Sequence, residues 1–101
     1  NGRRYYKAYV ADRLDGEWKP VADTADKPFA GWNNIRPAPG AGSWTDNVSH
    51  GELIRDGYDQ TLTLDPENLR FIFQGMLDKD KSGKGYGQFS WRIGMLTPAE
   101  R

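Results

Sequence analysis

The sequence predicts an all-β fold made of short strands and tight turns. Runs of aromatic and β-branched residues recur along the chain, and no stretch shows the apolar period of an amphipathic helix. The composition agrees, because four Trp, five Tyr and four Phe stand beside 12 Gly and six Pro, the residues of strands and of turns. A length of 101 residues allows at most one domain with a modest core.

Two strands are predicted in the first part of the chain. Residues 5–11 (YYKAYVA) form the first, the turn residues LDG follow at 14–16, and residues 17–21 (EWKPV) form the second. Pro20 marks the second strand as a sheet edge or a strand end, since proline donates no backbone hydrogen bond. A long irregular stretch, residues 22–43, separates this pair from the rest.

Four further strands are predicted after Trp44, joined as an antiparallel meander. Their ranges are 48–55 (VSHGELIR), 60–64 (QTLTL), 69–77 (LRFIFQGML) and 89–97 (FSWRIGMLT). DGYD at 56–59 and DPEN at 65–68 supply the first two turns, and the longer loop DKDKSGKGYGQ supplies the third. That loop resembles the start of an EF-hand, but Phe89 stands where a bidentate Glu is required, which favours a solvated loop without calcium.

The chain begins with Asn1-Gly2, a strong signal for a hairpin turn. A hairpin at this position needs a partner strand upstream, so we expect the chain to be a fragment of a longer protein.

Charge and composition argue against several function classes. Lys and Arg total 14, as do Asp and Glu, so no basic excess favours nucleic acid as a partner. No apolar run approaches the roughly 20 residues of a membrane span. Cysteine is absent, which excludes disulfides and thiolate metal sites within these residues.

Several runs resemble a known enzyme family: YYKAYVADRLDGEWKPVADT, PFAGWNN, WTDNVSHGELIRDGYDQTLTLDPENLRFIFQG and YGQFSWRIGMLT. They are similar to the last third of glycoside hydrolase family 62, whose members are α-L-arabinofuranosidases that remove arabinose branches from xylan. The resemblance implies a five-bladed β-propeller, with residues 1–43 forming the end of blade four and its connection and residues 44–101 forming blade five. Family 43 shares this architecture and remains an alternative.

His50 is the only histidine in the chain and precedes Gly51, which allows another group to approach the backbone closely. The resemblance implies that His50 lines the central channel and helps to hold a calcium ion on the propeller axis. Because calcium prefers oxygen ligands, such a site would have mostly water partners and a structural role. The alternative is a channel histidine that only forms hydrogen bonds.

Tyr86 and Gly87 are the predicted substrate-binding residues. The resemblance implies that Tyr86 contributes to the sugar-binding cleft, although a tyrosine packed under its own loop is an equal alternative. The family commonly has Tyr-Asn here, so Gly87 lacks the polar side chain of that asparagine. We expect Trp91 to pack within the blade and Arg92 to be a buried ion-pair partner.

No catalytic residue is expected within these 101 residues. Asp46 and Glu52 could form an acid–base pair, since inverting glycosidases use two carboxylates about 6.5–9.5 Å apart. The resemblance, however, implies that the acid and base lie upstream. The expected function is therefore that of a secreted, extracellular, inverting α-L-arabinofuranosidase acting on arabinoxylan or arabino-oligosaccharide, with this chain docked on the remainder of its propeller. The alternative is a non-catalytic carbohydrate-binding β-domain that uses Trp and Tyr faces.

Overall fold

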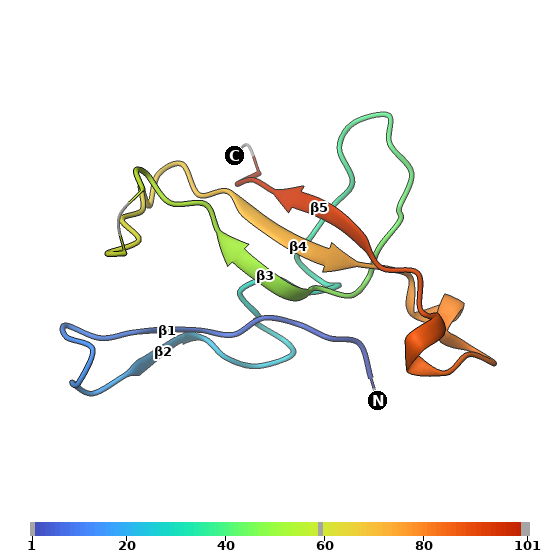
Figure 1. The fold of residues 1–101 in the computed structure, drawn as a ribbon, viewed down its shortest axis with the longest axis horizontal. Coiled ribbons are helices and arrows are strands. Elements are labelled where there is room, and N and C mark those ends of the chain that lie inside the picture. The colour runs from blue at the N-terminus through green and yellow to red at the C-terminus, as the bar shows by residue number, and fades with distance from the viewer. Residues whose placement is uncertain (1, 59, 100–101) are drawn as a thin grey trace.

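The computed structural model describes residues 2–58 and 60–99 and has two antiparallel sheets, which confirms the all-β prediction. Asn1, half of the predicted hairpin turn, lies outside this range. The elements in chain order are β1 (Ala8–Val10), β2 (Lys19–Ala22), β3 (Ser49–Leu53), β4 (Phe71–Gly75), the 3₁₀ helices η1 (Asp78–Lys81) and η2 (Tyr86–Gln88), and β5 (Arg92–Leu96). Figure 1 shows the β1–β2 hairpin lying along one side of the sheet formed by β3, β4 and β5.

β1 and β2 form a two-stranded sheet in which Tyr9 pairs with Pro20 and Val10 with Lys19. Every strand of such a sheet is an edge, so the missing N–H of Pro20 removes no ladder partner that the fold needs. Both strands are shorter than predicted. β1 begins later than expected because Tyr6, which lies before it, forms an isolated bridge with Ala30 instead.

The second sheet has the order β3-β4-β5, with β4 in the centre. The predicted strand at residues 60–64 is wrong, since its described residues belong to no strand. Leu62 has a left-handed φ of 57°, and the Asp56 amide donates to the Thr63 carbonyl at 2.7 Å, which closes this segment on itself. The residues have high strand propensity but no neighbouring strand to pair with, and context overrides the propensity.

The core lies between the central strand and the chain segments that cross it. Phe71 and Phe73 of β4 are buried and on alternate positions, as the period of a strand requires. The rings of Tyr6 and Phe29 meet Phe71 edge-on, with centroids at 4.9 and 5.5 Å, while Trp44 stacks on Phe73 at 5.7 Å. The irregular stretch and the N-terminal segment therefore complete the core that the sheet begins.

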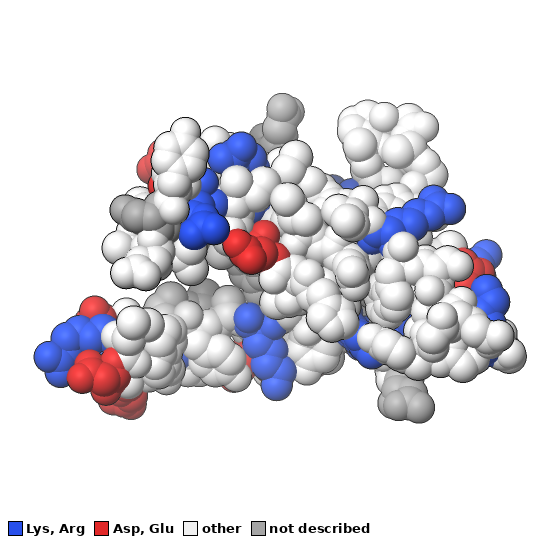
Figure 2. Space-filling model, in the orientation of Figure 1, with Lys and Arg blue, Asp and Glu red and all other residues white. Residues whose placement is uncertain are grey.

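The chain exposes more surface than a self-contained domain of its size. Its accessible area is 8043 Å², whereas a folded protein of 11.4 kDa exposes about 5,800 Å². Its radius of gyration is 15.1 Å, against about 13 Å for a compact domain of this length. On the face in Figure 2, positive and negative side chains are interspersed in small groups on a largely uncharged surface. Within the described residues, no helix is long and apolar enough to cross a membrane.

Candidate functional site

A β-bulge places His50 at the surface of the sheet. Ser49 pairs with Gln74 and Glu52 with Ile72, so β3 has one residue more than β4 between these pairs. His50 has a φ of 46°, a left-handed conformation that histidine adopts more readily than most residues. The bulge turns Ser49 inward, where it is 7% exposed, and leaves His50 exposed.

Gly51 completes the bulge because no side chain fits at its position. A Cβ there would overlap the Phe71 ring and lie 2.8 Å from the Ile72 carbonyl oxygen. The Tyr6 hydroxyl accepts a hydrogen bond from the Gly51 amide and donates to the Gly51 carbonyl oxygen at 3.2 Å. Tyr6 thus satisfies the backbone groups that a bulge leaves without ladder partners.

A short chain of polar contacts runs from His50 to the N-terminal segment. The Ser49 Oγ lies 3.1 Å from the His50 Nδ1, and the Arg4 Nη1 donates to the same Oγ at 3.0 Å. Among the described residues, the Nε2 atom of His50 has no hydrogen-bond partner and is left for another group. These contacts hold the imidazole by one nitrogen only.

Arg4 also contacts the loop that carries Tyr86. Its guanidinium carbon lies 5.5 Å from the centre of the Tyr86 ring and 5.3 Å from that of Trp91, both within cation–π range. The two predicted site residues, His50 and Tyr86, are therefore connected through one arginine. Arg4 could not be identified from the sequence, because an arginine just before a strand gives no indication of which residues its side chain will contact.

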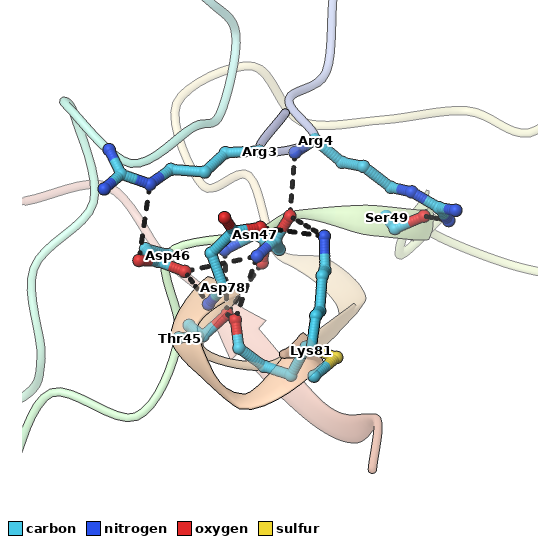
Figure 3. Close-up of polar contacts among 9 residues, drawn as sticks. Arg3, Arg4, Thr45, Asp46, Asn47, Ser49, Asp78 and Lys81 are labelled. Carbon is cyan, nitrogen blue, oxygen red and sulfur yellow. Dashed lines mark hydrogen bonds and ion pairs between the residues drawn. The ribbon is translucent and has the colours of Figure 1, made fainter. Parts of the chain in front are cut away.

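Asn47 joins three segments beneath this site (Figure 3). It is fully buried, and its Oδ1 accepts hydrogen bonds from the Arg4 amide at 2.8 Å and from the Lys81 Nζ at 3.1 Å. Its Nδ2 donates to the Asp46 Oδ1 and to the Met76 carbonyl oxygen, each at 3.2 Å. One amide side chain thus holds together the N-terminal segment, the residues just before β3, and the segment from Met76 into η1.

The loop between β4 and β5 is further fixed through Asp78. The Lys81 Nζ lies 2.9 Å from the Asp78 Oδ1, and the Asp78 amide donates to the Asp46 Oδ1 at 2.7 Å. The hydrogen bond from Lys81 lowers the pKa of Asp78 below its ordinary value, against a smaller opposing effect of burial. The loop is built from two 3₁₀ helices, and the described residues contain no group of three or more His, Cys, Asp or Glu side chains that could hold a metal.

Tyr86 and Gly87 both lie in η2 and are exposed, Tyr86 at 59%. The Tyr86 ring packs on Phe89 with a centroid distance of 5.5 Å, so it is presented by its own loop and also reachable by a ligand. A Cβ on Gly87 would meet nothing within 4 Å, so the space that an asparagine would occupy is open. Arg92 is exposed rather than buried, and the expectation of a buried ion pair is wrong because β5 is an edge strand.

The two carboxylates considered as an acid–base pair, those of Asp46 and Glu52, lie in different surroundings in the structure. The Asp46 carboxylate pairs with Arg3 at 3.4 Å and accepts hydrogen bonds from Asn47 and Asp78, while Glu52 is an exposed residue of β3. A hollow of about 380 Å³ beside β3 has Arg4, Ser49 and His50 among its lining residues, and no described Asp or Glu lines it. The hydrogen-bond donors that line this hollow are suited to a polar, hydroxyl-rich ligand.

Comparisons with known proteins agree on one family. The model of glycosyl hydrolase family 62 matches residues 1–97. Alpha-L-arabinofuranosidase C of Cellvibrio japonicus (strain Ueda107) is 43% identical over 96 residues, which cover 95% of this chain and 15% of that protein. Two solved structures are also similar: the catalytic domain of the Coprinopsis cinerea α-L-arabinofuranosidase (TM-score 0.85, 41% identity) and the Podospora anserina α-L-arabinofuranosidase in complex with cellotriose (TM-score 0.84, 38% identity). Each alignment covers 95% of this chain and 29% of the solved chain, so the chain spans less than a third of the length of these relatives.

Proposed function

Because the chain belongs to glycosyl hydrolase family 62, we propose that the complete protein is an α-L-arabinofuranosidase that removes arabinofuranosyl branches from arabinoxylan with inversion. The observation that carries this proposal is the agreement of 43% sequence identity with a TM-score of 0.85, both over 95% of the chain and both to arabinofuranosidases. We propose that the enzyme acts outside the cell, where a polymeric substrate of this kind would be met. We propose that the acid and the base lie upstream of these residues, as the family resemblance implies; within the described residues, Asp46 pairs with Arg3 and Glu52 is an exposed strand residue.

We propose that residues 1–43 form the end of blade four and residues 44–101 form blade five of a five-bladed propeller. The partner of this chain is then the remainder of its own propeller. The large exposed area supports this, since the chain exposes roughly 2,200 Å² more than a compact protein of its mass. Exposed apolar residues lie on the edge strand β5, where Ile93 is 77% and Met95 56% exposed.

Tyr86 is proposed to bind the substrate, with Gly87 leaving space beside it. An exposed tyrosine ring can stack on a sugar face, while its hydroxyl forms a hydrogen bond with a ring hydroxyl. The lack of a side chain at Gly87 removes one polar contact and widens the cleft for a branched arabino-oligosaccharide.

His50 is proposed to contribute one ligand to a structural calcium ion. Its Nδ1 is held by Ser49, which is the usual arrangement for a histidine that binds a metal through its other nitrogen. The described residues contain no group of three or more His, Cys, Asp or Glu side chains that could hold a metal, so in this proposal water and the rest of the propeller supply the oxygen atoms that calcium prefers. When bound, the ion would add positive charge near the catalytic carboxylates.

The activity is tested by incubating the complete protein with arabinoxylan and following the released arabinose by NMR. Direct formation of the β-anomer supports inverting hydrolysis. Retention of an inactive protein on immobilised arabinoxylan would instead support a non-catalytic carbohydrate-binding domain. The ion is tested by the thermal midpoint with and without calcium: His50→Ala should lose the calcium-induced rise, because an ion stabilises only the state that binds it. An equal rise in both proteins would exclude His50 as a ligand.

A further inference from the structure

We infer that Arg4 is a positioning residue that holds His50 and Tyr86 in one fixed arrangement. The inference rests on the proposed function, in which both residues serve the sugar-binding cleft and the channel. A positioning role does not require Arg4 to contact the sugar or the ion itself. Its effect would pass through Ser49 on one side and through the Tyr86 ring on the other.

The guanidinium makes two kinds of contact at once. Its Nη1 donates to the Ser49 Oγ at 3.0 Å, and that oxygen lies 3.1 Å from the His50 Nδ1. Its central carbon also lies over the rings of Tyr86 and Trp91, 5.5 and 5.3 Å from their centroids. A planar group with five donors can combine a directed hydrogen bond with ring contacts, whereas the point charge of a lysine cannot reproduce both.

The backbone of Arg4 is fixed as firmly as its side chain. Its amide donates to the Asn47 Oδ1 at 2.8 Å, and its carbonyl oxygen accepts from the Val48 amide at 3.0 Å. The same Asn47 oxygen accepts from Lys81, in the loop that presents Tyr86. The Asn47 Oδ1 therefore binds both the Arg4 backbone and the loop that carries Tyr86. This shared contact fixes the position of Arg4 relative to that loop.

Ser49 sets the orientation of the imidazole. It is 7% exposed, and its Oγ accepts from Arg4, so the position of this oxygen beside the His50 Nδ1 is determined by the guanidinium. Because His50 sits on a bulge with a left-handed backbone, the contact between the Ser49 Oγ and the His50 Nδ1 is the one that orients its ring. Loss of Arg4 frees the Ser49 hydroxyl to rotate, and the ring loses its fixed partner.

The test uses the complete protein with Arg4→Lys and, as a matched control, Arg3→Lys. Arg3 is the adjacent arginine and makes contacts of the same kinds, with the Trp32 ring at 5.6 Å and with Asp46 at 3.4 Å, but none with Ser49 or Tyr86. Both variants keep the positive charge. The readouts are kcat and KM on arabinoxylan oligosaccharides, and the imidazole nitrogen NMR signals of His50, identified by their absence in His50→Gln.

For Arg4→Lys we expect kcat/KM to fall by about tenfold, in line with the loss of other supporting hydrogen bonds around a site. The fall should come largely from KM if Tyr86 binds substrate, and the His50 signals should shift. Ser49→Ala should shift the same signals, and adding Arg4→Lys to it should change them no further. In Arg3→Lys both readouts should stay as in the wild type.

Equal kinetics and equal His50 signals in the Arg4→Lys and Arg3→Lys proteins would overturn the inference. If Arg4→Lys does not fold, Ser49→Ala carries the test, since it removes the link to His50 and leaves the N-terminal segment in place. A wild-type protein without arabinofuranosidase activity would refute the proposed function. The NMR comparison would then still decide whether Arg4 holds His50.

Discussion

Replacing Asn47 by alanine should be the most damaging single polar substitution beneath this site. Asn47 is fully buried and its side chain makes four hydrogen bonds. Three of its partners keep another contact: Asp46 has Arg3, Lys81 has Asp78, and the Met76 carbonyl has the Asp46 amide. For the amide of Arg4, no further hydrogen-bond acceptor is seen in the described part of the chain.

The expected loss follows from these contacts. The part-buried Arg4 amide would lose its acceptor, at a cost of about 1–3 kcal/mol, and each of the other three bonds contributes about 0.5 kcal/mol when its partner keeps a second contact. The free energy of unfolding of Asn47→Ala should therefore fall by about 3 kcal/mol. This value is measured from urea unfolding curves of the complete protein, provided that the slope with denaturant stays unchanged.

Asn33→Ala is the matched control. The Asn33 Nδ2 also donates to two backbone carbonyls, those of Ala25 at 3.2 Å and Asp26 at 2.9 Å, but the residue is exposed and water can replace the amide. Its loss should stay below about 1 kcal/mol. An Asn47→Ala protein no less stable than Asn33→Ala would refute the view that Asn47 holds three segments together.

Three further predictions concern the loop, the sheet packing and the isolated chain. The pKa of Asp78 is lowered by Lys81, so its contribution to stability is present above the ordinary value of 3.8 and is lost as the pH falls through the lower folded-state value. The thermal midpoints of wild type and Asp78→Asn should thus differ at pH 6 and converge in acid, whereas a constant difference would exclude the ion pair as the cause. Gly94→Ala should cost about 1–3 kcal/mol in urea unfolding, because its Cβ would lie 2.5 Å from the Trp44 Cζ2, while Gly42→Ala, with nothing within 4 Å, should be neutral. The 101 residues alone should unfold at low denaturant, and a cooperative transition at high denaturant would show a self-contained domain instead.

The strand pattern after Trp44 was largely readable, and its one failure is instructive. β3, β4 and β5 each fall inside a predicted run, and in β4 Phe71 and Phe73, on alternate positions, bury one face. Residues 60–64 also have residues that favour a strand, yet Leu62 takes a left-handed conformation and stays half exposed. Propensity describes how residues suit a strand, but whether a partner strand lies alongside depends on the tertiary fold.

The site was predictable only at its ends. The family resemblance pointed to His50 and Tyr86, but nothing in the sequence indicated the residues that connect them in space. Arg4 lies 45 positions before Ser49, and its choice of partner depends on the register shift in β3. Asn47 falls between the irregular stretch 22–43 and the predicted strand 48–55 and was not singled out, because burial of a polar side chain cannot be read from its type.

Gly51 shows how far the sequence alone could lead toward the site. A glycine after the single histidine predicted a close approach to the backbone, and the structure confirms that a Cβ would not fit. The group that approaches is the Phe71 ring, and the Tyr6 hydroxyl bonds both backbone groups of Gly51. The glycine therefore serves the bulge, and the bulge presents His50. Any substitution that relaxes the bulge, such as Gly51→Ala, should disturb His50 without touching it, so the conformation of this one strand is itself part of the site.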